Sequence, residues 1–177
     1  MKVLEPAQGF LLRIDDVTDR LERLAPLAPA PGGLTAPDEP SGEQWEWGQV
    51  WAHLGEFVPY WCGEIKRIVE ADSDKPVPFG RIKTDPGRVG AIERDRRTSS
   101  EALMDRLSSQ LRDARVLLTD LSPDDWKRRG LHETLGEVDI EEIVEAFLCR
   151  HLEDHADQLD GLVRGAGNGL TGCDQLR

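Results

Sequence analysis

Long apolar runs are absent from this sequence, and cysteine is scarce. No stretch approaches the roughly 18 uncharged apolar residues that a membrane-spanning helix needs. The opening residues, MKVLEPAQGFLLRIDD, meet an acidic residue and a proline before an apolar run can develop, which argues against a secretory signal peptide. The three cysteines, Cys62, Cys149 and Cys173, are odd in number and lack the spacing of a disulfide framework. These absences predict a cytoplasmic protein.

Basic residues are also in deficit. Among 177 residues there are 22 Lys and Arg against 34 Asp and Glu, a net charge of −12. A chain this acidic is repelled by polyphosphate and by anionic lipid, so we expect neither nucleic acid nor a membrane surface as a partner. Glycine-rich phosphate loops, dinucleotide-binding fingerprints and nucleophile elbows are missing as well.

Four segments do carry the three- and four-residue spacing of apolar side chains that is typical of amphipathic helices. They span residues 6–24, 41–71, 98–121 and 139–164. Ser41, Thr98 and Asp139 are each followed three residues later by Gln or Glu, which is the capping-box pattern at a helix start. Strand patterns are weak. The sequence therefore predicts an all-α bundle that forms one domain over 1–164, followed by a flexible glycine-rich tail at 165–177.

The connection between the second and third predicted helices is unusually long. Residues 73–97 include Pro76, Pro78, Pro86 and three glycines, and about 25 residues are far more than an antiparallel hairpin needs. Such a segment can carry the chain back along the bundle. We therefore expect a long crossover that makes these two helices parallel neighbours.

Three of the four histidines lie on predicted apolar faces. His151 and His155 are four residues apart, so both imidazoles lie on one face of the last helix, beside its apolar stripe. His53 takes the equivalent place on the second helix. One divalent ion that accepts a nitrogen from each ring would satisfy all three. The alternative is three separate core histidines, each hydrogen-bonded to its own neighbours.

The angular position of a residue around its helix shows whether its side chain can join this site. Cys62 and Cys149 fall almost opposite the histidines and are therefore expected to be packing or surface residues rather than ligands. Glu56 and Gln158 each follow a histidine by three residues, where they can orient an imidazole or form ordinary surface contacts. His132 is expected in a solvated loop, with a substrate contact as the alternative. A site with three protein ligands is open, which favours catalysis over a structural role.

The residues WEWGQVWAHLGE, LSPDDW and RHLEDHADQL resemble the DinB/YfiT-like superfamily of metal-binding four-helix bundles, over about residues 43–162. The resemblance implies an up-down-down-up bundle, a divalent metal on His53, His151 and His155, and a homodimer. Some members, among them mycothiol-dependent maleylpyruvate isomerase and bacillithiol transferases, use the metal to activate a low-molecular-weight thiol. The chain ends soon after the bundle, so the isomerase reaction itself is not expected.

Two functions follow as hypotheses. The first is a metal-dependent enzyme, most simply a thiol S-transferase or a related transferase or hydrolase, with a small-molecule substrate or thiol as its partner. Zinc and nickel are the expected metals and iron is a further candidate, because nitrogen ligands suit all three. The second is a non-catalytic stress or ligand-binding module that the metal stabilises.

The second predicted helix carries more aromatic residues than one stripe can bury. They spread around more than half of its circumference, which predicts a homodimer interface. The alternative is that the connector 27–40 or the long crossover folds over this surface. The aromatic residues of this helix are Trp45, Trp47, Trp51, Phe57, Tyr60 and Trp61.

Overall fold

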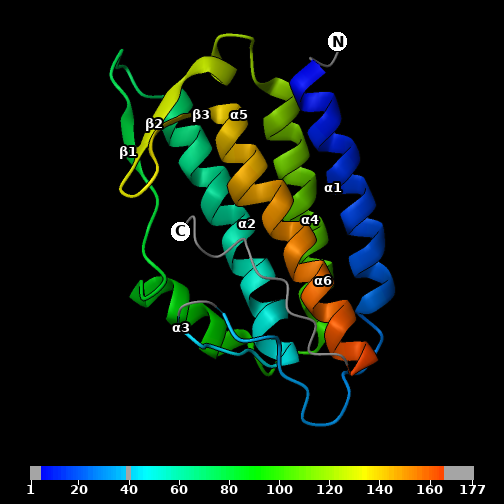
Figure 1. Ribbon diagram of the computed structural model, residues 1–177. Coiled ribbons are helices and arrows are strands. Elements are labelled where there is room, and N and C mark those ends of the chain that lie inside the picture. The colour runs from blue at the N-terminus through cyan, green and yellow to red at the C-terminus, as the bar shows by residue number, and fades with distance from the viewer. Residues whose placement is uncertain (1–4, 39–40, 166–177) are drawn as a thin grey trace.

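The computed structural model describes residues 5–38 and 41–165, and four long helices packed side by side dominate it (Figure 1). They are α1 (Glu5–Leu24), α2 (Trp47–Val69), α4 (Ser100–Asp120) and α6 (Arg150–Arg164). α1 and α6 run in one direction, and α2 and α4 run in the other (Figure 1). The up-down-down-up arrangement and the parallel pairing across the long crossover are thus confirmed. Within the described part of the chain, no helix has the length and apolarity to cross a bilayer.

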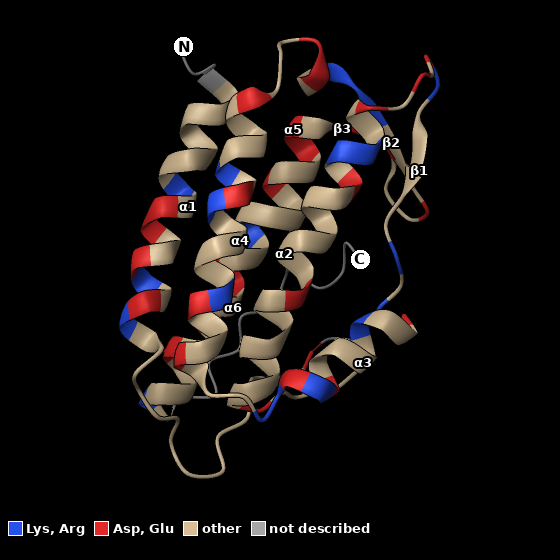
Figure 2. Ribbon diagram, turned by 180° about the vertical axis from the view of Figure 1, so that it is seen from behind, with Lys and Arg blue, Asp and Glu red and all other residues tan. Residues whose placement is uncertain are grey.

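Apolar stripes hold the helices together through one continuous core. Ile14, Leu54, Leu107 and Leu159 come from the four different helices, and each is fully buried in this core. Ion pairs reinforce the contact between α1 and α6, where Arg13 pairs with glutamates and Arg20 with aspartates. Charged residues accordingly occupy much of α1, whereas most of α2 is uncharged (Figure 2). The predicted tail lies outside the described residues apart from Gly165, whose left-handed backbone (φ 70°) ends α6.

The crossover contains structure that the sequence patterns did not predict. A short strand, β1 (Val77–Phe79), is followed by α3 (Pro86–Asp95). β1 pairs in parallel with β2 (Arg129–His132), which pairs in antiparallel with β3 (Gly136–Asp139). The all-α prediction therefore describes the bundle and misses a small sheet at one end of it. Strands of three or four residues are too short to show an alternating pattern.

Two helix starts differ from the capping boxes expected from sequence. α2 begins at Trp47 rather than near Ser41, because Trp45 pairs with Thr35 through two hydrogen bonds of 2.9 Å and is held outside the helix. The capping contact comes from Gln49, whose Oε1 accepts from the amide of Glu46 at 3.0 Å. α4 is capped by Ser99, one residue after the predicted Thr98.

The last helix begins at Asp139, as predicted, but is not a regular α-helix throughout. The reciprocal bonds between Asp139 and Glu142 open α5 (Ile140–Ile143). A π-helical turn, η2 (Val144–Cys149), then leads directly into α6. A short 3₁₀ turn, η1 (Asp125–Lys127), precedes the sheet and buries Trp126 against the core.

The aromatic surface of α2 is covered within the chain. Phe79 of β1 packs on Trp61, and the guanidinium of Arg81 lies 3.7 Å from the centre of the Tyr60 ring. Among the described residues, none of the aromatics between 45 and 61 is one of the exposed large hydrophobic side chains. This is the arrangement that the sequence leaves open as the alternative to an interface. The homodimer stays a prediction.

Two glycines of α2 test how closely α3 approaches it. A Cβ atom on Gly48 would lie 2.0 Å from the backbone oxygen of Arg96, whereas a Cβ on Gly63 would meet nothing within 4 Å. We expect Gly48→Ala to lower the free energy of unfolding by about 1–3 kcal/mol, because the new methyl group would push α2 away from the backbone at Arg96. Gly63→Ala should raise it by about 0.5–1 kcal/mol, since alanine is the better helix former. Urea denaturation measures both, and equal stability of the two variants would contradict the close approach.

Candidate metal centre

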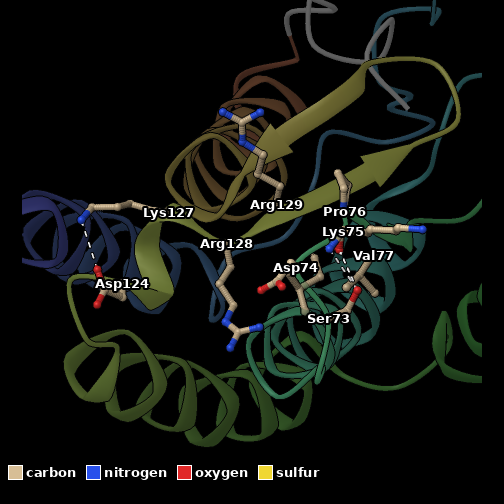
Figure 3. A pocket seen from close by; sticks show the side chains of 10 residues that line it. Ser73, Asp74, Lys75, Pro76, Val77, Asp124, Lys127, Arg128 and Arg129 are labelled. Carbon is tan, nitrogen blue, oxygen red and sulfur yellow. Dashed lines mark hydrogen bonds and ion pairs between the residues drawn. The ribbon is translucent and has the colours of Figure 1, made fainter.

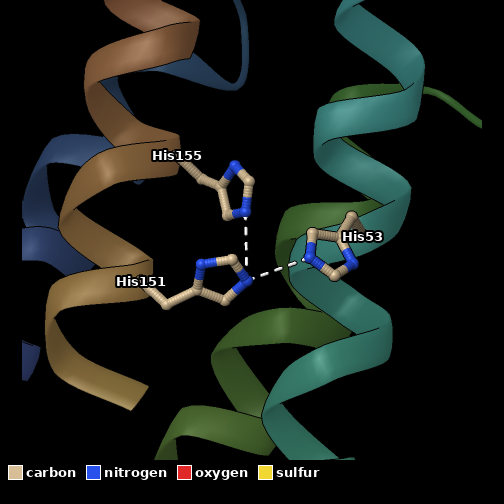
Figure 4. Close-up of side chains that lie close together, drawn as sticks. All are labelled: His53, His151 and His155. Atoms are coloured by element: carbon tan, nitrogen blue, oxygen red, sulfur yellow. Dashed lines mark hydrogen bonds between the residues drawn. The ribbon is translucent and has the colours of Figure 1, made fainter. Parts of the chain in front are cut away.

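Three imidazole rings meet between α2 and α6. His53 lies in the second turn of α2, and His151 and His155 lie in the first two turns of the antiparallel α6, with all three rings pointing at one another (Figure 4). Nε2 of His151 is 3.0 Å from Nε2 of His53 and 3.2 Å from Nε2 of His155. The three side chains belong to residues that are only 2%, 3% and 6% exposed. The helix register therefore brings together the residues that the sequence singles out.

The other ring nitrogens show which atoms face the common point. Nδ1 of His155 lies 2.7 Å from Oε1 of Gln158, and Nδ1 of His53 lies 3.3 Å from Oε2 of Glu56. The contact of His155 with Gln158 has hydrogen-bond geometry, whereas that of His53 with Glu56 is a close charged contact without it. An oxygen acceptor beside each Nδ1 favours a proton there and a lone pair on each Nε2. His151 can donate a proton to only one of its two neighbours. At least one pair of Nε2 lone pairs is then in repulsive contact unless a cation lies between them.

This arrangement fits a divalent metal ion. Zinc–nitrogen bonds of about 2.0–2.1 Å in a tetrahedron place the ligand nitrogens roughly 3.3 Å apart, close to the separations observed here. Among the described residues, the group whose ligand atoms lie within 4.8 Å of one another consists of His53, His151 and His155. The triad is thus consistent with a divalent metal held by three protein nitrogens. The identity of the metal does not follow from this geometry.

An aromatic wall encloses the triad. The indole of Trp45 stacks on His155 with the ring centres 5.9 Å apart and the planes within 5° of parallel. The ring centre of Trp45 also lies 5.0 Å from that of His53, with the two rings edge to face. The ring centre of Phe57 lies 4.2 Å from that of His151. The guanidinium of Arg88 lies 5.2 Å from the Trp45 ring centre. Sequence reasoning missed this role of Trp45, because its position depends on pairing with Thr35 ten residues earlier and not on helical spacing.

The π-helical turn η2 changes the angular relation between residues before and after it. One extra residue in a turn rotates the following residues by about 100° relative to a continuous α-helix. Cys149, which an α-helix would place opposite His151, is as buried as His151 itself. It lies outside the triad, as does Cys62. Both cysteines are buried packing residues, so the surface alternative for them is wrong.

His132 differs from its predicted place. It lies in β2 and is 5% exposed, so the solvated-loop expectation is wrong. Its Nδ1 accepts from the amides of Thr134 and Leu135 at 3.3 and 3.4 Å, and its ring packs on Phe79 and Phe147. Burial lowers the pKa of this imidazole. These contacts give His132 a role in joining the sheet to the bundle, and a substrate contact stays an untested alternative.

A polar cavity of about 340 Å³ lies at the other end of the bundle (Figure 3). It borders Ile68, which is about 22 Å along α2 from His53 at 1.5 Å per residue. Three of its cationic side chains have partners: Arg128 donates to the carbonyl of Ala71 at 2.7 Å, Lys127 pairs with Asp124 at 3.1 Å and Arg129 pairs with Glu137 at 3.1 Å. The cavity is lined by Ile68, 73–77, Asp124 and 127–129. We assign it no binding role.

Comparison with known proteins identifies the class to which this bundle and its triad belong. Residues 13–159 match the model of the DinB superfamily, and the chain is therefore a member of that superfamily. A comparison with curated protein sequences gave no match.

Solved structures share the fold at low sequence identity. YfiT from Bacillus subtilis, described as a probable metal-dependent hydrolase with an unusual four-helix bundle topology, is 16% identical with a TM-score of 0.69. The match covers 93% of this chain and 90% of YfiT. Mycothiol-dependent maleylpyruvate isomerase is 15% identical with a TM-score of 0.64, and a histidine-to-alanine mutant of it is 16% identical with the same score. These two matches cover 96% and 86% of this chain but only 65% and 60% of the isomerase chains.

The two buried cysteines give a direct test of how tightly the core of the bundle is packed. Burial raises the pKa of the Cys62 thiol to about 11 and that of Cys149 to about 12. A thiol that ionises near pH 9 when unfolded is then still protonated in the fold, so these groups lower stability as the pH rises above 9. In a Cys173→Ser background, we expect native protein at pH 8 to resist a thiol-specific disulfide reagent. Denatured protein should react at two thiols, and rapid reaction of the native protein would contradict the packing.

Proposed function

We propose that this protein is a metal-dependent enzyme whose open metal site is formed by His53, His151 and His155. The observation that carries the proposal is the convergence of three buried Nε2 atoms. On the other side of two of the rings, Nδ1 of His155 and Nδ1 of His53 each lie near an oxygen that can accept a hydrogen bond. Zinc or nickel is the proposed metal, and iron is a further candidate, because imidazole nitrogens suit each of them. Three protein ligands leave a coordination position for a substrate.

The chain's own residues would perform defined tasks around this ion. Gln158 would orient the ring of His155 through the hydrogen bond to its Nδ1, and the Glu56 carboxylate would orient His53 through the charged contact at 3.3 Å, so that each Nε2 faces inward. Trp45 and Phe57 shield the triad from water, which strengthens electrostatic interactions there. A bound divalent ion supplies Lewis acidity, which lowers the pKa of a thiol or water molecule that it coordinates.

We further propose thiol S-transfer as the reaction. In such a transfer the thiol loses its proton to solvent and its sulfur forms a bond to an electrophilic carbon of the second substrate. The bond from that carbon to its leaving group breaks, and the leaving group departs with the electron pair, as chloride does from a chlorobimane. Membership of the DinB superfamily and the fold shared with a mycothiol-dependent enzyme support a low-molecular-weight thiol of the mycothiol type as co-substrate. Burial raises the pKa of Cys62 and of Cys149, so neither is expected to supply the reactive thiolate, and in this proposal the reacting sulfur belongs to the co-substrate.

Hydrolysis is the second candidate. The match to YfiT, described as a probable metal-dependent hydrolase, covers nearly the whole of both chains, which favours it. The two reactions would use the same ligands and would differ in whether a thiol or a water molecule enters the open position.

Removal of one ligand should remove the metal. We expect His151→Ala or His155→Ala to retain less than a tenth of the metal bound by the original protein, because two imidazoles rarely hold a divalent ion against solvent. The far-ultraviolet circular dichroism should stay helical, since apolar stripes hold the bundle. Elemental analysis after dialysis measures the loss.

The matched control for that experiment is His132→Ala, which removes a buried histidine outside the triad and should leave the metal content unchanged. Cys62→Ser should also leave it unchanged. A full equivalent of metal in either triad variant would show that the ligand assignment is wrong.

An activity screen separates the functions. Metal-loaded protein is incubated with mycothiol, bacillithiol, glutathione or cysteine together with a chlorobimane electrophile, and separately with nitrophenyl esters. Thiol-dependent consumption of the electrophile that His151→Ala abolishes supports the transferase. Ester cleavage without a thiol supports the hydrolase, and bound metal with neither activity favours a non-catalytic module.

A further inference from the structure

The carboxylate of Glu56 joins the crossover to one of the triad histidines. Its Oε1 lies 2.5 Å from Nη2 of Arg81, and its Oε2 lies 3.3 Å from Nδ1 of His53. The side chains of Glu56 and Arg81 are only 10% and 13% exposed. A cation from the crossover and an imidazole of α2 thus share one nearly buried carboxylate.

Arg81 reaches this carboxylate because the sheet directs the crossover toward α2. β1 ends at Phe79, and Gly80 follows with φ 94°, a backbone conformation that side chains other than glycine rarely adopt. The amide of Gly80 donates to Oε2 of Glu64 at 2.8 Å, which fixes the turn against α2. The guanidinium carbon of Arg81 then lies 3.7 Å from the ring centre of Tyr60, one helical turn after Glu56. A planar group that stacks and donates at the same time suits arginine and not lysine.

The pairing controls where the Glu56 carboxylate points. A carboxylate with little solvent around it needs a cation or hydrogen-bond donors, and Arg81 supplies the charge on one oxygen. The other oxygen then remains toward His53. Asp85 also lies 3.9 Å from Nη1 of Arg81 and keeps the guanidinium in place from the crossover side. Without Arg81, the carboxylate would gain by rotating toward water, and the imidazole of His53 would lose the charged group that lies 3.3 Å from its Nδ1.

We propose that Arg81 is a positioning residue for the metal ligand His53 and acts through Glu56. The inference rests on the proposed metal site and adds that the long crossover contributes to metal affinity without supplying a ligand. Because such coupling is reciprocal, metal binding also holds the crossover against α2.

The test measures metal affinity rather than activity. We expect Arg81→Ala to weaken Zn²⁺ binding by about 10–100-fold, the usual effect of losing a group that orients a ligand. Competition with a chromophoric chelator gives the dissociation constant. With Co²⁺ in place of Zn²⁺, the visible absorption bands should shift, since the position of one imidazole changes. Glu56→Gln keeps the shape of the side chain and should weaken binding to a similar degree, and it carries the test if Arg81→Ala does not fold.

A double-mutant cycle and a matched control separate positioning from general damage. Arg81→Ala combined with Glu56→Gln should be no weaker than Glu56→Gln alone, because both changes break one pathway. Lys83→Ala removes another crossover cation, which pairs with Asp38 at 2.8 Å, and should change the dissociation constant less than twofold. The inference would be overturned if the two changes weakened Zn²⁺ binding additively, if Lys83→Ala weakened it as much as Arg81→Ala does, or if Arg81→Ala left it unchanged. Absence of metal binding in the original protein would instead overturn the proposed function.

Discussion

The close approach of three buried imidazoles is the constraint on which the rest of the molecule depends. The Nε2 atom of His151 lies 3.0 Å from that of His53 and 3.2 Å from that of His155, and aromatic rings surround all three. Such an approach requires α2 and α6 to be antiparallel and fixed in register, since a shift of one turn moves a ring by about 5.4 Å. The continuous core across all four helices fixes that register. Packing in the bundle therefore determines the geometry at the triad.

The segments between the helices determine the surroundings of the triad. The connector before α2 contains Trp45, which stacks on His155. The crossover contains Arg88, which packs on Trp45, and Arg81, which pairs with Glu56. The crossover must be long because α2 and α4 are parallel, and its length provides room for β1 and α3. The helices thus supply the ligands, while the connections supply the groups that shield and orient them.

This division explains what could be predicted from the sequence. Apolar periodicity predicts the four helices, and the four-residue spacing of His151 and His155 predicts a shared face, because both depend on local helix geometry. The same reasoning cannot locate Trp45 over His155 or Arg81 on Glu56, since each contact joins segments far apart in the chain. It also misses the π-helical turn before α6, which has no apolar spacing of its own to mark it.

The packing has a thermodynamic consequence for the metal. In small zinc domains the site forms only with the ion, and the free energy of binding is largely free energy of folding. Here the four helices share one continuous apolar core, which includes Ile14, Leu54 and Leu107, so we expect the bundle to fold without an ion. The core holds the three Nε2 atoms in an arrangement in which His151 can donate a proton to only one of its two neighbours. A cation that binds there meets ligands already placed by the core, so binding does not have to order the chain first.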